Sequence, residues 1–285
     1  MRPVRLLTAA LAGILAFQAI DSQSVSAQPV APEQVRPTYA DLVDLALAAP
    51  VVAHVRVIRA SRLSPREAAD VAPGERRFLV EAEVVNLIRA PGPLPAQVVW
   101  LVDLANDARG RPARIARRSE YLLLAAPVPG RPDTLRLIAP DSQLAYDAAT
   151  VELVRDILRE AMSPDAPPRI TGIGNAFHVA GSLPGESETQ IFLATADGRP
   201  ISLSILRRPG ERPRWSVALS EIVDDSAAPP APETLLWYRL ACGLPPTLPA
   251  DSLGQASAGD AQAIRDDYRI VLRGLGPCER RRTAN

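Results

Sequence analysis

Two histidines, His54 and His178, are the side chains of this sequence best suited to acid–base chemistry near neutral pH. Acid–base catalysis needs a partner within hydrogen-bond reach, and the two histidines fall in different predicted domains. A serine nucleophile could be built from Ser182 or Ser187, but the segment 185–189 lacks the second glycine of a nucleophile elbow. The sequence therefore predicts no catalytic set, and each histidine is more simply a surface or half-buried side chain.

The segment 185–190, GESETQ, is the most unusual polar cluster, with Glu186 and Glu188 on either side of Ser187. Carboxylates at this spacing suit a metal ion, a sugar hydroxyl or an acid pair, and Asp224 could supply a further carboxylate for a hydrolase. A calcium ion needs more oxygen ligands than these side chains provide. The pattern therefore favours a solvated turn whose hydroxyls satisfy nearby backbone groups.

A basic cluster follows, in which Arg207 and Arg208 precede Arg212, Arg214 and Trp215. Guanidinium groups hold carboxylates and phosphates in a forked geometry, so these residues are candidates for binding an anionic partner. Every one of the 32 basic residues is Arg, however, so the type of the residue carries little information at any one position. The alternative is a charged hairpin tip.

The N-terminus has the three parts of a secretory signal peptide over residues 1–27. Arg2 and Arg5 precede an apolar run that is shorter than the roughly 20 residues that span a bilayer. Small residues then predict cleavage between Ala27 and Gln28. We therefore expect a periplasmic or secreted protein with no membrane insertion after cleavage, and a mobile leader over residues 28–38.

The chain has two cysteines, Cys242 and Cys278, which an oxidising compartment would allow to pair. Their spacing does not fit a metal site or a reactive thiol pair, so a disulfide is expected. Acidic and basic residues balance at 32 each, which excludes a general attraction to nucleic acid. No cofactor is predicted, and the expected partner is an envelope protein or a small ligand.

Residues 39–163 have the pattern of a small barrel with flanking helices. A helix over residues 39–49 leads into five strands, and a helix that Asp147 can cap ends this domain. The five strands are expected at residues 51–59, 78–88, 97–102, 120–125 and 134–138. In strand order this half resembles the OB-like barrels of secreted proteins, including the netrin-module and metalloproteinase-inhibitor type, although the N-terminal cysteine of the inhibitors is missing.

Residues 169–278 are predicted to form a second domain after the Pro-rich linker 163–168. Period-two alternation predicts three strands of a meander with one buried face and one hydroxyl-rich face. The strands are expected at residues 189–195, 201–205 and 215–219, with Asp197-Gly198 as the first hairpin turn. Two helices follow, one begun by Pro232 and one capped by Asp260, before a charged, frayed tail over residues 279–285. The fold class is therefore α+β.

Three segments, GESETQIFLATADGRPISL, RRPGERPRWSVALSEIVD and LLWYRLACGLP, resemble exported proteins of alphaproteobacteria of the sphingomonad kind. The resemblance implies export and no particular activity. The leading hypothesis is a non-enzymatic exported protein that acts through binding or as an envelope accessory. A carboxylate-dependent hydrolase or carbohydrate-active enzyme is the alternative, and a protease-inhibitor-like barrel is the third.

Overall fold

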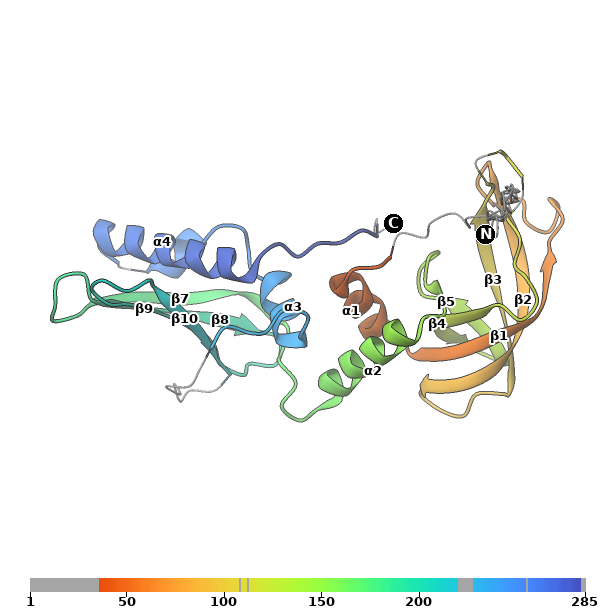
Figure 1. Ribbon diagram of the computed structural model, residues 1–285, viewed down its shortest axis with the longest axis horizontal. Helices are drawn as coiled ribbons and strands as arrows, with labels where there is room; N and C mark the ends of the chain where they lie inside the picture. Colours follow the sequence, from red (N-terminus) through yellow and green to blue (C-terminus); the bar gives the residue numbers. More distant parts are fainter. Residues whose placement is uncertain (1–35, 108, 112, 220–227, 255, 283–285) are drawn as a thin grey trace, which may run out of the picture. The chain divides into compact units, whose positions relative to one another are not determined.

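The computed structural model describes residues 36–107, 109–111, 113–219, 228–254 and 256–282 (Figure 1). The predicted signal peptide, its cleavage point and Asp224 lie outside the described residues, as do most of the leader and the last three residues of the tail. In the described part the α+β class is confirmed: a closed five-stranded barrel occupies the N-terminal half, and a four-stranded antiparallel sheet follows it.

The N-terminal half contains α1 (Tyr39–Ala48), β1 (Val51–Arg62), β2 (Glu75–Arg89), β3 (Gln97–Ala105), β4 (Glu120–Val128), β5 (Arg131–Leu137), β6 (Gln143–Ala145) and α2 (Ala148–Met162). The sheet runs β1-β2-β3-β5-β4-β6, and β1 also pairs with β4, which closes the barrel. Only β3 and β5 pair in parallel among the described strands. The interior is filled by alternate residues of the strands, among them Val55, Val80 and Trp100. The predicted barrel is confirmed, with longer strands and the additional short strand β6.

The helices of this half begin where side chains satisfy their first amide groups. Thr38 and Asp41 form a reciprocal capping box at the start of α1. Asp147 caps α2 as predicted, accepting a hydrogen bond of 2.9 Å from the amide of Thr150. Both helices bury leucine and valine side chains against the outer side of β1 at Val52.

The C-terminal half contains β7 (Ile170–Ala180), β8 (Ser187–Thr195), β9 (Ile201–Arg207), β10 (Arg214–Ala218), α3 (Leu235–Ala241), the 3-10 helix η1 (Ala250–Leu253) and α4 (Ala258–Leu275). The sheet order is β10-β9-β8-β7, so the predicted meander has a fourth strand. The sequence pattern did not predict β7, because two register shifts, around Gly172 and before Ala176, interrupt the alternation of apolar and polar residues along the strand.

One face of this sheet lies under α4 (Figure 1). The alternating Ile191, Leu203 and Ile205 pack there against Ile264 and Val271 of the helix. Ser202 and Ser216, which the alternation places between these apolar positions, belong to the opposite face. The helix therefore covers the apolar face, and the hydroxyl-rich face is turned away from it.

Two predicted helix starts are corrected. The first C-terminal helix begins after Thr234, whose hydroxyl accepts from the amide of Trp237 at 3.2 Å, and not at Pro232. The last helix is capped by Ser257, with Asp260 three residues inside it. The Ser257 hydroxyl accepts from the amide of Asp260 and donates to its carboxylate at 2.8 Å. Ser257 therefore satisfies the free amide at the start of the helix, and Asp260 supports this cap from the first turn.

The expected disulfide between Cys242 and Cys278 is present, with an S–S distance of 2.06 Å. It joins the end of α3 to the segment that follows α4. No helix among the described residues is both long and apolar enough to cross a bilayer.

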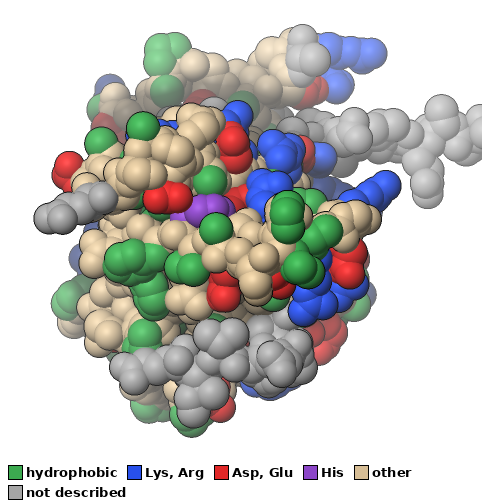
Figure 2. All heavy atoms as spheres, turned by 90° about the vertical axis from the view of Figure 1, so that its left-hand side faces the viewer, with side chains coloured by type: hydrophobic (Ala, Val, Ile, Leu, Met, Phe, Trp, Pro, Cys, Tyr) green, Lys and Arg blue, Asp and Glu red, His purple; other side chains and the backbone are tan. Residues whose placement is uncertain are grey.

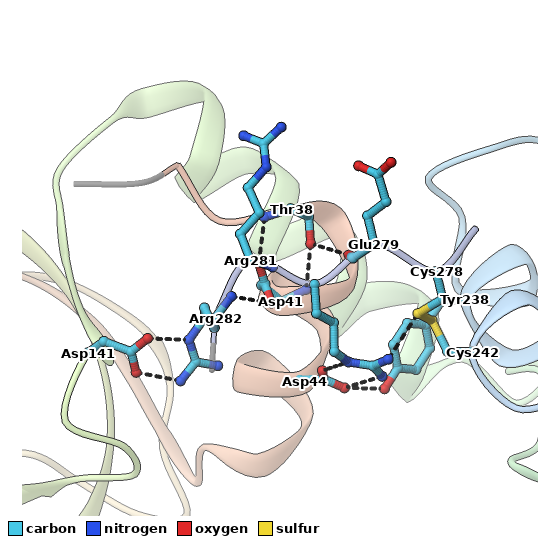
Figure 3. Close-up of polar contacts among 11 residues, drawn as sticks. Thr38, Asp41, Asp44, Asp141, Tyr238, Cys242, Cys278, Glu279, Arg281 and Arg282 are labelled. Atoms are coloured by element: carbon cyan, nitrogen blue, oxygen red, sulfur yellow. Dashed lines mark hydrogen bonds and ion pairs between the residues drawn. A yellow bond between two sulfur atoms is a disulfide. The ribbon is translucent and has the colours of Figure 1, made fainter. Parts of the chain in front are cut away.

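Residues 279–282, which we call the C-terminal strap, lie against the first turn of α1 (Figure 3). The hydroxyl of Thr38 donates to the carbonyl of Glu279 at 2.7 Å, and the amide of Arg281 donates to Asp41 at 3.0 Å. Burial raises the pKa of Asp41, but the amides that donate to its carboxylate, from Thr38 and the strap, lower this pKa by more. The expectation of a frayed tail therefore does not hold for these four residues.

Side chains of the strap form ion pairs as well (Figure 3). Arg280 pairs with Asp44 of α1 at 2.6 Å, and Arg282 donates from Nε to Asp141 at 2.6 Å. Tyr238 of α3 also donates to Asp44, and burial together with this carboxylate raises the pKa of Tyr238 to about 12. Asp44 is thus shared by α3 and the strap.

Candidate binding groove beside strand β7

A groove of about 440 Å³ lies between the edge strand β7 and the segment that leads through η1 into α4. Its wall on one side is residues 175–179 of β7, and on the other side it is Ser252, Leu253, Gly254, Ala256 and Asp260. Figure 2 shows the surface on this side of the molecule, with a histidine visible among hydrophobic, acidic and basic side chains. The lining mixes apolar and polar groups, as small-ligand sites do.

The register of β7 decides which side chains face α4. After its second register shift, Ala176 pairs with Ile191 and His178 pairs with Thr189. Ala176 and His178 consequently share the side of the sheet that α4 covers, whereas Phe177 points away and is 55% exposed. His178 therefore lies at the border between the buried core and the groove.

A chain of hydrogen bonds runs from His178 into the core. Its Nδ1 lies 2.8 Å from the hydroxyl of Thr189, which in turn donates to Oδ2 of Asp267 in α4. Oδ1 of Asp267 accepts from Nε of Arg207 at 2.8 Å and also from its Nη2. We call these four residues the His178 network; it joins three strands to α4.

Burial makes the His178 network costly to disrupt. Thr189 and Asp267 are both fully buried, at 0% exposure. A buried carboxylate is tolerated only when it is paired and hydrogen-bonded, and here Arg207 and Thr189 provide both. The position of His178 is consequently fixed from inside the protein, while its ring borders the groove.

The predicted acidic cluster does not reach this groove. Glu186 accepts from the amide of Leu183 and closes the β7–β8 turn, so it has the local role that a solvated turn requires. Glu188 accepts from the side chains of Gln190 at 2.9 Å and Ser204 at 3.1 Å on the sheet face away from α4. Ser187 lies at the start of β8 and is partly exposed.

The predicted basic cluster is divided in the same way. Arg207 belongs to the His178 network, so its guanidinium holds a carboxylate of the chain itself. Trp215 is 9% exposed and packs into the core, so close to Gly274 that a Cβ there would lie 2.5 Å from its ring nitrogen. Arg208 is exposed at the hairpin tip, and its anion-binding role stays a prediction.

The other histidine lies on the outer side of the barrel in a different network. Nε2 of His54 is 2.9 Å from Glu120, which also accepts from Nε of Arg56 at 2.9 Å. The His54 ring stacks on Tyr146 with 4.0 Å between centroids. Hydrogen bonds from Arg56 and then His54 lower the pKa of Glu120. His54 is thus paired directly with a charged group.

Sequence reasoning missed Thr189 and Asp267, although Asp267 left a signal. It occupies the apolar stripe of α4 between Ile264 and Val271. A carboxylate is expected at such a buried position only when a hydrogen-bonding or cationic partner lies opposite it. Asp260 and Ser252, on the other wall of the groove, gave no such signal because the fold alone brings them to β7.

The described residues contain no group of three or more histidine, cysteine, aspartate or glutamate side chains that could hold a metal ion. No protein-family model matches this chain, and no curated protein matches its sequence. The assignment of a function therefore depends on the geometry of the groove and on the sequence.

Proposed function

We propose that this protein is an exported binding protein that acts in the periplasm or outside the cell, and that it takes a small ligand in the groove beside β7. One observation carries the proposal: His178 borders an open groove and is held there by hydrogen bonds that lead to the fully buried Thr189 and Asp267. Pre-organised polar groups of this kind increase affinity because less ordering is needed on binding.

Export is supported by the sequence pattern of residues 1–27 and by the disulfide, which suits an oxidising compartment. The resemblance to exported alphaproteobacterial proteins points the same way. A carboxylate-dependent hydrolase receives less support, because Glu186 and Glu188 are engaged in hydrogen bonds outside the groove.

The compartment is tested by expressing the full chain with its own leader in a Gram-negative host and fractionating the cells. We expect the protein in the periplasm or medium, with Gln28 as its first residue by N-terminal sequencing. An uncleaved chain in the cytoplasm would contradict export.

The groove is tested by titrating the mature protein with sets of sugars, amino acids, amines and carboxylates, followed by NMR of backbone amides. We expect a binder to shift the amides of residues 175–179 and 252–260. The variant Ala256→Phe should block the groove, and Ala194→Phe, an exposed position on the other face, is its matched control. Binding that survives Ala256→Phe and is lost in Ala194→Phe would place the ligand elsewhere.

A further inference from the structure

We infer that the His178 network holds the neutral His178 ring with its proton on Nδ1, so that Nε2 presents an acceptor to the groove, and that the ligand is a primary ammonium on an apolar body. The inference about the ligand rests on the proposed binding function; the inference about the ring proton does not.

The position of the proton follows from counting donors. A guanidinium has no acceptor, so both contacts between Arg207 and Asp267 are donated to the carboxylate. A carboxylate paired in this way accepts from Thr189 as well, which uses the one proton of the threonine hydroxyl. The hydroxyl oxygen can then only accept from His178, so the nitrogen 2.8 Å away, Nδ1, carries a hydrogen.

A neutral imidazole has one N–H, and therefore Nε2 keeps its lone pair. Such a nitrogen binds a ligand that donates a hydrogen bond and has nothing to offer a carboxylate or phosphate. This is the logic by which a second partner selects the tautomer of a histidine. Thr189 is consequently a positioning residue, since it acts on the ligand through His178.

The opposite wall of the groove adds a negative charge. Asp260 is the one acidic side chain among the described residues that line the groove, and no arginine is among them. Its Oδ2 accepts from the Ser257 hydroxyl at 2.8 Å, which orients the carboxylate. Hydrogen-bond acceptors therefore line the groove from two elements, this carboxylate of α4 and Nε2 of His178 in β7. An ammonium group satisfies both acceptors and balances the charge, whereas an anion would meet repulsion.

The apolar part of the ligand follows from the rest of the lining. Ala176, Leu253 and Ala256 contribute side chains without polar atoms to this lining. A cation attached to an aromatic or aliphatic body would bury this surface while its charged end meets His178 and Asp260. Small aromatic amines are therefore suitable probes.

The ring proton is tested first, by recording the ring ¹⁵N shifts of His178 in the intact mature protein at pH about 8.5, above the usual titration range of histidine. We expect the pattern of an Nδ1–H tautomer in the native protein and in Thr189→Ser, which keeps the hydroxyl. Thr189→Val removes the acceptor for this proton and should lose the preference. An Nε2–H pattern in the native protein overturns the inference directly.

The ligand class is then tested with benzylamine, benzyl alcohol and benzoate, which share one apolar body. We expect benzylamine to bind about tenfold more tightly than the alcohol, and benzoate to show no saturable shift. Asp260→Asn should remove the advantage of the amine over the alcohol, and His178→Ala should weaken both, while Glu188→Gln on the other face changes neither.

The outcomes separate the two proposals. Benzoate binding in the groove as tightly as benzylamine would overturn the ligand class and leave the groove as a binding site. A failure of all three probes to shift any groove amide, with the Nδ1–H tautomer present, would count against the ligand class and against the groove as a site for small molecules, while the proton assignment would stand.

Discussion

The two histidines of this protein are each part of a hydrogen-bonded network, yet only one of them borders a groove. On the barrel, His54 is bonded directly to Glu120 and covered by Tyr146, and only 8% of it is exposed. On the sheet, His178 is bonded to the neutral hydroxyl of Thr189, and the charge of Asp267 is one residue further away. The difference teaches that an intervening hydroxyl can hold a histidine ring in place without a direct contact between the ring and a carboxylate.

The two halves of the chain also differ in where they hold their charged groups. Barrel pairs such as Arg56–Glu83 and Arg59–Glu81 lie at the surface, where ion pairs contribute little. The Arg207–Asp267 pair of the C-terminal half joins β9 to α4, with the carboxylate fully buried. Variants of charged residues should therefore lower the free energy of unfolding more in the C-terminal half than in the barrel.

The largest effect is expected from the disulfide, which only the C-terminal half contains. Replacing Cys242 and Cys278 by Ser should lower the free energy of unfolding by about 4 kcal/mol, because the bridge closes a loop with a sequence separation of 36 residues. Urea denaturation measures the loss, and hydrogen exchange locates it. Faster exchange in α4 than in β1 to β4 would sharpen the contrast between the halves, and equal acceleration everywhere would remove it.

The second effect is expected at the buried carboxylate. Asp267→Asn should cost about 3 kcal/mol, since it leaves Arg207 without its counter-charge and disturbs Thr189. The matched barrel variant Glu120→Gln should cost about 1 kcal/mol or less, because Glu120 and its partner Arg56 are both partly exposed. Chemical denaturation of both variants tests the contrast, which fails if the two losses are the same.

A smaller, pH-dependent effect is expected where the strap meets the barrel half. The pKa of Asp41 is lower in the folded protein than its ordinary value of 3.8, so its contribution to stability is fully present above that value. This contribution disappears as the pH falls through the folded pKa. Denaturation between pH about 2 and 6 should show that the native protein loses more stability on acidification than Asp41→Asn does. The variant should be about 1–2 kcal/mol less stable at neutral pH.

The smallest change in stability is expected for His178→Ala, about 1 kcal/mol or less, because its ring lies at the border of the core. His54→Ala should cost more, about 1–2 kcal/mol, since it removes a partly buried hydrogen bond and a stacked ring. Probe binding should respond in the opposite order and change only in the His178 variant. A loss of probe binding in His54→Ala would break the comparison.

The extent to which sequence predicts this molecule depends on the range of the interactions involved. Period-two alternation identified β8, β9 and the barrel strands, because each pattern is local and repeated. It failed for β7, where glycines and register shifts interrupt the alternation. In the acidic segment 185–190, Glu186 lies in the turn and bonds locally to the amide of Leu183. Residues 187–190 belong to β8 instead, where Glu188 accepts from Ser204 and Thr189 donates to Asp267.

The groove could not be predicted because its two walls come from distant segments. His178 and Asp260 lie on opposite walls of a groove that forms only when α4 packs on the sheet. Asp267 is the exception, since a carboxylate on the apolar stripe of a helix indicates a buried partner. The sequence alone therefore indicated that Asp267 has a buried partner. The structure was required to identify the partners as Arg207 and Thr189.

The C-terminal strap has a consequence for the order of events in folding. The carboxylate of Asp41, in the first turn of α1, accepts from the amides of Arg281 and Arg282, which follow it by 240 and 241 residues. Contacts of such high sequence separation form late, because the loop between them must close first. Helix α1 therefore acquires its final set of partners only after residues 281 and 282 have been synthesised. A fully hydrogen-bonded Asp41 carboxylate therefore indicates that the chain has folded as far as residue 282.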